Sequence, residues 1–191
     1  RDRTVHAVNG VDLDLAAGEV LCILGESGSG KSVTLRALMK LLPKFAHISG
    51  GIEVGGRDVN AMNNSQLADF RGGEVAMIFQ EPMTALNPVM TVGDQIIEAL
   101  QQHLPLSRNE ASAKAIEGLQ RVGVDDAARR MGSYPHQLSG GQRQRVMIAM
   151  ALSCNPKLLI ADEPTTAVDV TTQAQILNLM RDLQQEFGMA I

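Results

Sequence analysis

A glycine- and serine-rich segment at residues 25–32, GESGSGKS, limits the possible folds of this chain more than any other feature. It follows a short apolar run and precedes a stretch with helical apolar spacing. The segment fits the pattern G-x-x-x-x-G-K-[ST], in which glycines let backbone amides turn inward around phosphate oxygens. The helix that follows begins with unpaired N–H groups and the positive end of its dipole. The chain is therefore predicted to contain a strand–loop–helix unit with a phosphate site at the loop.

The pattern also gives individual side chains a task. Lys31 can reach terminal phosphates, and the hydroxyl of Ser32 can bind Mg²⁺. An ordinary Gly/Ser turn is the alternative, and the flanking strand and helix patterns favour the nucleotide site. The residues of this segment predicted to bind the nucleotide are Gly25, Glu26, Ser27, Gly28, Ser29, Gly30, Lys31, Ser32 and Val33.

The composition argues against several classes of protein. The 191 residues carry a net charge of −4, unlike proteins that hold nucleic acid by bulk positive charge. Aromatic residues make up 3% of the chain, so base-stacking surfaces are not expected. No apolar run approaches the roughly 18 residues of a membrane-spanning helix. Cys22 and Cys154 lie in apolar surroundings and are predicted to be buried thiols rather than a disulfide or a metal site.

Apolar patterning predicts an α/β fold with a mostly parallel sheet. Loose alternation indicates an antiparallel strand pair at 4–15, and glycine spacing indicates a hairpin at 49–59. Uninterrupted apolar runs predict strands covered on both faces at residues 20–24, 75–79, 158–161 and from 189 onward. Helical spacing is found at residues 32–42, 91–131, after 140, and 170–187. We expect a single domain, residues 1–191, with a core at about 1–80 and 151–191 and an inserted helical subdomain at 81–150.

Two neighbouring acids follow the apolar run LLIA, where that strand should end. Asp162 and Glu163 would point to opposite faces of a continuing strand, but Pro164 ends the ladder there. Both carboxylates can then gather at the carboxyl edge of the sheet, where open α/β proteins bind ligands. Asp162 is predicted to hold the metal, and Glu163 to orient or deprotonate an attacking water. A solvated acidic turn is the alternative interpretation.

The segment LSGGQ, residues 138–142, predicts a second helix whose N-terminus is bare and rich in amides. A chain with one nucleotide does not need two such sites within itself. A two-fold dimer in which each subunit lends this turn to its neighbour's nucleotide explains the second site. A capped helix with a glycine hinge is the alternative. The residues predicted to contact that nucleotide are Ser139, Gly140, Gly141 and Gln142.

Five ordered motifs make the chain resemble the ATP-binding cassette (ABC) ATPases over essentially its whole length. GESGSGKS, FQEP, LSGGQ, LLIADEP and AVD resemble Walker A, the Q-loop, the signature, Walker B and the D-loop in their family order and spacing. Two longer segments are similar to the dipeptide, oligopeptide and nickel importer branch of this family: MIFQEPMTALNPVMTVGDQI and YPHQLSGGQRQRVMIAMAL. The resemblance implies a P-loop NTPase (RecA-like) core, ATP and Mg²⁺ as cofactors, and ATP hydrolysis that drives solute import.

The resemblance also implies roles and partners. Gln80 would bind Mg²⁺ and sense the attacking water. Residues 81–92 would face the coupling helices of membrane permeases. Asp169 would cross the dimer interface near the nucleotide. The D-loop has Val168 where the family more often has Leu. The implied partners are a second ABC ATPase subunit, identical or different, two integral membrane permease subunits and, indirectly, a periplasmic or lipoprotein solute-binding protein, without nucleic acid. The implied location is peripheral, at the cytoplasmic face of the cell membrane.

Two departures from the family pattern bear on activity. The stretch that should supply an aromatic ring to adenine has none, which leaves Arg3, Val5 or His6 for that contact. The family's switch histidine should follow the strand that begins at Met189, and the sequence stops at Ile191, before that position. His136 is expected to be structural rather than catalytic. Since the sequence begins with Arg and ends in an apolar run, we expect it to be a piece of a longer protein. The chain is therefore expected to bind nucleotide and hydrolyse it slowly.

Three other functions compete with an importer ATPase. A soluble ABC ATPase of DNA repair or translation usually carries a long coiled-coil insertion or a second cassette, and neither pattern is present. A non-hydrolysing nucleotide switch stays open for this piece of the chain, which lacks the switch histidine, but not for the longer protein. A P-loop kinase should lack LSGGQ. The sequence does not specify the transported solute.

Overall fold

Two parallel strands form the centre of the fold. In the computed structural model, which describes residues 5–80, 85–166 and 169–191, β3 (Val75–Ile78) pairs in parallel with β4 (Leu158–Ala161). On the other side of β4, Ala190 forms a parallel bridge with Leu158. Ile191 in turn donates to the Glu19 carbonyl and accepts from the Leu21 amide, at 2.9 and 2.8 Å. The predicted strands at 75–79 and 158–161 are confirmed and run in parallel, and the strand predicted from 189 onward is represented in the described chain by the single parallel bridge at Ala190.

Successive residues of these strands enter two different cores, because side chains alternate across a strand. Val75 and Ile160 pack with Met39, Val59, Met62, Leu67 and Phe70 on one face. Ala76, Ile78 and Leu159 pack on the other face with residues of the helices that follow β3 and β4. Both strands therefore read as continuous apolar runs, as expected when a sheet is covered on both faces.

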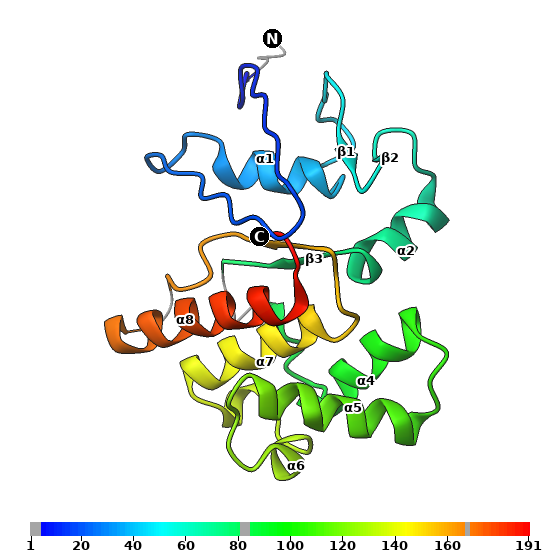
Figure 1. Ribbon diagram of the computed structural model, residues 1–191, viewed down its shortest axis with the longest axis vertical. Coiled ribbons are helices and arrows are strands. Elements are labelled where there is room, and N and C mark those ends of the chain that lie inside the picture. Colours follow the sequence, from blue (N-terminus) through cyan, green and yellow to red (C-terminus); the bar gives the residue numbers. More distant parts are fainter. Residues whose placement is uncertain (1–4, 81–84, 167–168) are drawn as a thin grey trace.

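The two faces carry different layers (Figure 1). On one side of β3 lie α1 (Lys31–Leu38) and the hairpin of β1 (Glu53–Val54) and β2 (Arg57–Asp58). On the other side lie α4 (Val92–His103), α5 (Arg108–Arg121), α6 (Ala127–Arg130), α7 (Gly140–Leu152) and α8 (Val170–Phe187). The hairpin expected at 49–59 and the helices expected at 91–131, after 140 and at 170–187 are confirmed.

The helical block has no core separate from the sheet. Leu100, Leu119 and Ile148, from three of its helices, are fully buried in the same cluster as Ile78 and Ile176. This shared cluster fixes the block against the strand ends. The division into a core and an inserted subdomain at 81–150 stays a prediction.

Polar side chains mark where the helices begin. Asn63, Thr91, Ser107, Ser139 and Asp169 each accept a hydrogen bond from a backbone amide in the first turn of the following helix. Such caps satisfy amides that have no partner within the helix. The sequence analysis missed α2 (Asn64–Gly73), although its Asn-x-x-Gln start is a recognisable capping box.

The N-terminal strands predicted at 4–15 and 20–24 are wrong for the residues described there. Residues 5–30 contain no assigned strand, and Val5 and Leu24 have exposed fractions of 77% and 88%. Apart from the bonds of Glu19 and Leu21 with Ile191, no backbone ladder joins this part of the described chain. An alternating pattern forms a strand only where another strand pairs with it. The burial predicted for Cys22 is likewise wrong, since this thiol is exposed, whereas Cys154 is half-buried.

The helix predicted at 32–42 ends four residues early. Lys40 takes a left-handed conformation (φ 52°), and the Leu41 and Lys40 amides donate to the Arg36 and Ala37 carbonyls. This pair of bonds is the Schellman motif, which normally uses glycine. The Lys40 ammonium donates to the Asn60 and Met62 carbonyls at 3.0 and 3.1 Å, which ties the helix end to the hairpin segment.

Among the described helices, none has both the length and the apolar character needed to cross a bilayer.

Neighbouring residues of α8 provide a test of this packing. Ile176 is fully buried, whereas the side chain of Leu177 has an exposed fraction of 53%. We expect Ile176→Ala to lower the free energy of unfolding by about 2–5 kcal/mol through lost burial and a cavity. Leu177→Ala should change it by less than about 0.5 kcal/mol. Urea denaturation of both variants measures the difference, and equal losses would contradict the described orientation of α8.

Candidate nucleotide-binding site

The phosphate loop turns through left-handed glycines directly into α1. Gly28 (φ 80°) and Gly30 (φ 96°) occupy conformations that L side chains rarely adopt, and Gly30 is the N-cap of α1. A Cβ on Gly30 would lie 2.7 Å from the Ala7 carbonyl oxygen and 2.9 Å from a Val8 methyl. Residues 7–8 therefore pass directly against the loop, and only glycine fits there.

The side chain of Lys31 folds back across the loop. Its ammonium donates to the Gly25 carbonyl at 2.8 Å and to the Glu26 carbonyl at 2.9 Å. A Cβ on Gly25 would lie 2.7 Å from the Ser29 hydroxyl, so the loop is narrow at its base. The Lys31 ammonium is thus held by two backbone carbonyl groups of the loop, next to the N-terminus of α1.

A hydrogen bond joins the loop to the acidic strand end. The Ser32 hydroxyl donates to Asp162 Oδ1 at 2.7 Å, although the two residues are 130 positions apart. Asp162 is 2% exposed, and within the described chain its Oδ2 is buried without a hydrogen-bond partner. A buried carboxylate oxygen without a donor is costly unless another group binds it.

The second acid forms its own pair with Gln80. The Gln80 side-chain amide donates to Glu163 Oε2 at 3.0 Å. The Asp162 amide donates to the Ile78 carbonyl at 3.0 Å, so the ladder of β3 and β4 continues to the residue before Glu163. Glu163 itself is exposed and has a left-handed backbone (φ 48°) that turns it out of the strand. The structure therefore places Asp162 and Glu163 at the end of β4, the edge expected for them, and pairs them with Ser32 and Gln80. The roles of these residues in binding and catalysis stay predictions.

One residue at this edge was missed by the sequence analysis. The Thr166 hydroxyl lies 3.0 Å from Glu163 Oε2 and 3.3 Å from the Glu163 carbonyl oxygen. A threonine three positions after an acid in a turn is a signal for such side-chain bonding, but the pattern is common. Thr166 is therefore not among the site residues predicted from the sequence.

The turn of the LSGGQ segment is a capped helix start. The Ser139 hydroxyl accepts from the Gln142 amide at 3.3 Å, and the Gln142 side chain accepts from the Ser139 amide at 3.0 Å. A Cβ on Gly141 would lie 3.1 Å from a Thr172 methyl, so the first turns of α7 and α8 are in contact. In the described chain, no hydrogen bond links this turn to the phosphate loop. Figure 1 shows β3 between α1 and α7.

Asp169 is the N-cap of α8. Its two carboxylate oxygens accept from the Thr172 amide at 3.0 Å and the Thr172 hydroxyl at 2.7 Å. These hydrogen bonds hold the pKa of Asp169 below its usual value. The carboxylate is therefore charged at neutral pH and stabilises the start of α8.

Other predicted residues lie apart from these pairs. Val5 and His6 are exposed and directly precede residues 7–8, the segment that lies against Gly30. His136 stacks on Tyr134 with ring centroids 5.7 Å apart, as expected of a structural residue. Arg3, Val168 and residues 81–84 of the segment predicted to face the permeases lie outside the described residues.

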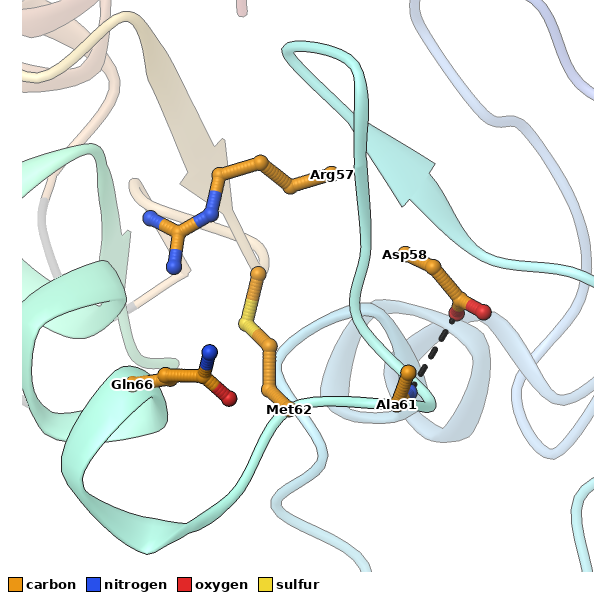
Figure 2. Close-up of a pocket in the computed structure, with 5 residues that line it drawn as sticks. All are labelled: Arg57, Asp58, Ala61, Met62 and Gln66. Carbon is orange, nitrogen blue, oxygen red and sulfur yellow. Dashed lines mark hydrogen bonds between the residues drawn. The ribbon is translucent and has the colours of Figure 1, made fainter.

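A hollow on the surface is separate from this site (Figure 2). Arg57, Asp58, Ala61, Met62 and Gln66 line a space of about 210 Å³ between the hairpin and the start of α2. It contains none of the predicted residues and is smaller than the ~300–1,000 Å³ of typical ligand pockets. The strand-end cluster, rather than this hollow, is the candidate functional site.

Comparisons with known proteins agree with the geometry. Residues 8–166 match the family described as ABC transporter. Oligopeptide transport ATP-binding protein AppD of Bacillus subtilis (strain 168) is 52% identical over 189 residues, covering 98% of this chain and 58% of AppD. Oligopeptide transport ATP-binding protein OppD of the same organism is 52% identical over 98% of this chain and 53% of OppD. The chain thus spans little more than half the length of these curated relatives.

A solved structure has the same architecture. The dimeric structure of a post-hydrolysis state of the ATP-binding cassette MJ0796, bound to ADP and Pi, has a TM-score of 0.84 and 32% sequence identity. The match covers 96% of this chain and 77% of that chain. The likeness therefore extends over the strand ends, the loop and the helical block together.

Two glycines of the loop test its described geometry. Gly28→Ala meets nothing within 4 Å, so we expect only the backbone strain of a left-handed alanine, about 1 kcal/mol. Gly30→Ala adds a collision with the Ala7 carbonyl and should lower the free energy of unfolding by roughly 2 kcal/mol more. Chemical denaturation compares the two. Equal destabilisation would show that residues 7–8 do not lie against the loop.

Proposed function

This chain belongs to the ABC transporter family, and from that premise we propose that it is an ATP-binding and ATP-hydrolysing subunit that powers peptide import across a membrane. The observation that carries the proposal is the pair of hydrogen bonds Ser32–Asp162 and Gln80–Glu163 at one sheet edge. The peptide part rests on relatives named for oligopeptide transport. The same names give no support to a soluble ATPase of DNA repair or translation.

Binding of the triphosphate is the task of the loop at residues 25–32. Backbone amides of the loop and the N-terminus of α1 donate to phosphate oxygens. Lys31, whose ammonium lies on the carbonyls of Gly25 and Glu26, carries the cation that meets the terminal phosphates. Val33, in the first turn of α1, contributes through that helix start.

The residues at the loop base fit a magnesium ion. The Ser32 hydroxyl and the Asp162 carboxylate, which are hydrogen-bonded through Oδ1, are hard oxygen groups of the kind that binds Mg²⁺, and Asp162 Oδ2 has no donor among the described residues. The described residues hold no cluster of three His, Cys, Asp or Glu side chains, which suits an ion completed by phosphates and water. Ser32, Asp162 and Gln80 would hold the Mg²⁺, which neutralises phosphate charge when it is bound.

Hydrolysis requires a water aligned with the terminal phosphorus. Glu163 is exposed at the strand end and carries a carboxylate for orienting that water or taking its proton. Gln80 donates to the same carboxylate and so connects it with the segment that leads to the helical block. The products are ADP and phosphate, and water is the only co-substrate.

Completion of the site requires a second subunit. Figure 1 shows β3 between α1 and α7, the helices that follow the loop and the LSGGQ turn, and we assign the capped start of α7 to a second molecule. In a two-fold dimer, Ser139, Gly140, Gly141 and Gln142 of each subunit contact the nucleotide of its partner, and Asp169 lies close to that interface. The similar cassette MJ0796, bound to ADP and Pi, is dimeric.

The burial and hydrogen bonds of the loop before α4 support the proposal that this loop contacts a membrane partner. Leu86 is buried at 2% exposure, whereas Val89 at the loop tip is 79% exposed. The side chain of Gln95 accepts from the Asn87 amide and donates to the carbonyl groups of Asn87 and Met90, which fixes the loop. We assign this rigid, exposed loop to permease subunits, with the chain at the cytoplasmic face of the membrane.

Turnover by this chain is proposed to be slow. His103 lies against Gly72, and His136 stacks on Tyr134. His6 is exposed in the N-terminal segment, and His47 lies after α1. None forms a hydrogen bond with Glu163 among the described residues, so transition-state charge is left with fewer donors.

Loss of the loop cation is the first test of the proposed function. Lys31→Ala should weaken binding of Mg·ATP by about 10-fold or more, since a charge-assisted contact is worth ~1.5–3 kcal/mol. Arg36→Ala, which removes an exposed cation from the same helix, should leave the affinity within about twofold. Calorimetric titration of both variants decides. Equal affinity of Lys31→Ala and the parent would overturn the assignment.

Trapping of the dimer is the second test. Glu163→Gln keeps the shape of the side chain but removes the base, so Mg·ATP should remain bound between two subunits. We expect sedimentation velocity to show a dimer with Mg·ATP and a monomer with Mg·ADP. A Glu163→Gln chain that binds Mg·ATP and stays monomeric at high protein concentration would contradict the proposed dimer.

A further inference from the structure

The hydroxyl of Thr166 makes a contact that the proposed roles leave unexplained. It lies 3.0 Å from Glu163 Oε2, the same oxygen that accepts from Gln80. It also lies 3.3 Å from the Glu163 carbonyl, but a hydroxyl has one proton. The shorter contact is to a charged acceptor, which forms the stronger hydrogen bond. The Glu163 carbonyl has another donor, the Thr166 amide at 3.3 Å.

The turn that carries Thr166 is held at both ends. Glu163 begins it with a left-handed backbone (φ 48°), directly after the buried Asp162. The Thr165 carbonyl accepts from the Gln173 side chain of α8 at 3.1 Å. The position of the Thr166 hydroxyl is therefore set by the strand end and by α8, rather than by Glu163 alone.

Two donors on a single carboxylate oxygen fix the rotation of an exposed side chain. Glutamate has three rotatable bonds, and burial does not restrict those of Glu163 because this residue is exposed. Gln80 reaches Oε2 from the end of β3, and Thr166 reaches it from the turn after β4. No hydrogen bond from the described residues reaches Oε1, which leaves that oxygen for a proton from water.

We propose that Thr166 is a positioning residue that, with Gln80, locks Glu163 so that Oε1 faces the attacking water. The inference rests on the proposed hydrolytic function for its consequence but not for its geometry. Without the hydroxyl, Glu163 samples several rotamers, and fewer of them align the water. Misalignment of this kind lowers the rate of the chemical step without weakening substrate binding.

The first experiment measures the side chain directly and requires no nucleotide. Three-bond couplings measured by NMR on the 191-residue chain report the rotamers of Glu163. We expect one dominant rotamer in the parent, averaging in Thr166→Val, and one dominant rotamer again in Thr166→Ser. Valine keeps the β-branched shape, and serine keeps the hydroxyl. An averaged Glu163 in the parent, or a fixed one in Thr166→Val, would overturn the proposal.

The second experiment measures the chemical step. Single-turnover hydrolysis of radiolabelled Mg·ATP should slow by about 10-fold or more in Thr166→Val and recover to within about threefold in Thr166→Ser. Binding of Mg·ATP and the thermal midpoint should change little, which separates positioning from folding. An unchanged rate in Thr166→Val, or a Thr166→Ser chain as slow as Thr166→Val, would refute the role. A parent chain that fails to bind Mg·ATP would refute the proposed function, while the rotamer measurement would still decide the role of Thr166.

Discussion

The parallel register of β3 and β4 is the constraint on which the candidate site depends. Ile78 lies opposite Ala161, so the residues that follow these two strands emerge at the same edge. The next ladder bond, from the Asp162 amide to the Ile78 carbonyl, fixes Asp162 before the chain turns. A slip of one residue would exchange the faces of every side chain in the strand. It would then move Asp162 away from Ser32 and separate Glu163 from Gln80.

Burial on both faces of the strands makes this register stable. One face packs on residues from α1, the hairpin segment and α2, and the other packs on α4, α5, α7 and α8. The loop is fixed to the first layer through α1, and the LSGGQ turn is fixed to the second through α7. The two amide-rich helix starts therefore belong to opposite layers of one chain, and in the proposed isologous dimer the start of α7 meets the nucleotide held by the loop of the partner subunit.

The site was predictable where a short pattern determines local geometry. The phosphate loop, the acids after LLIA and the capped start of α7 are each contained in a segment of a few residues. The residue types and their spacing in such a segment are enough to indicate its local geometry. The pairings Ser32–Asp162 and Gln80–Glu163 were not predicted, because they depend on how the loop and the ends of β3 and β4 come together in space. Thr166 was not predicted because its role depends on the left-handed turn at Glu163, which the sequence does not mark with glycine.

The errors in the fold have a similar physical origin. Residues 4–15 alternate loosely and residues 20–24 form an apolar run, as strands would. Strand formation depends on a pairing neighbour, however, and in the described part of residues 4–24 only Glu19 and Leu21 bond to one, Ile191. The helix at 32–42 stops early because Lys40 accepts a left-handed backbone, with its ammonium bound by two carbonyl groups of the hairpin segment. Both outcomes are set by contacts far along the chain, which local periodicity does not contain.

We propose that the loop serine, Ser32, and the strand-end aspartate, Asp162, act as one metal-binding unit. The direct measurement is a double-mutant cycle of Ser32→Ala and Asp162→Asn on ATP affinity, determined with and without Mg²⁺. We expect that either change removes the Mg²⁺-dependent part of the affinity and that the double variant loses little more, a coupling on the order of 1 kcal/mol or greater. Losses that simply add, or that are the same without Mg²⁺, would contradict it.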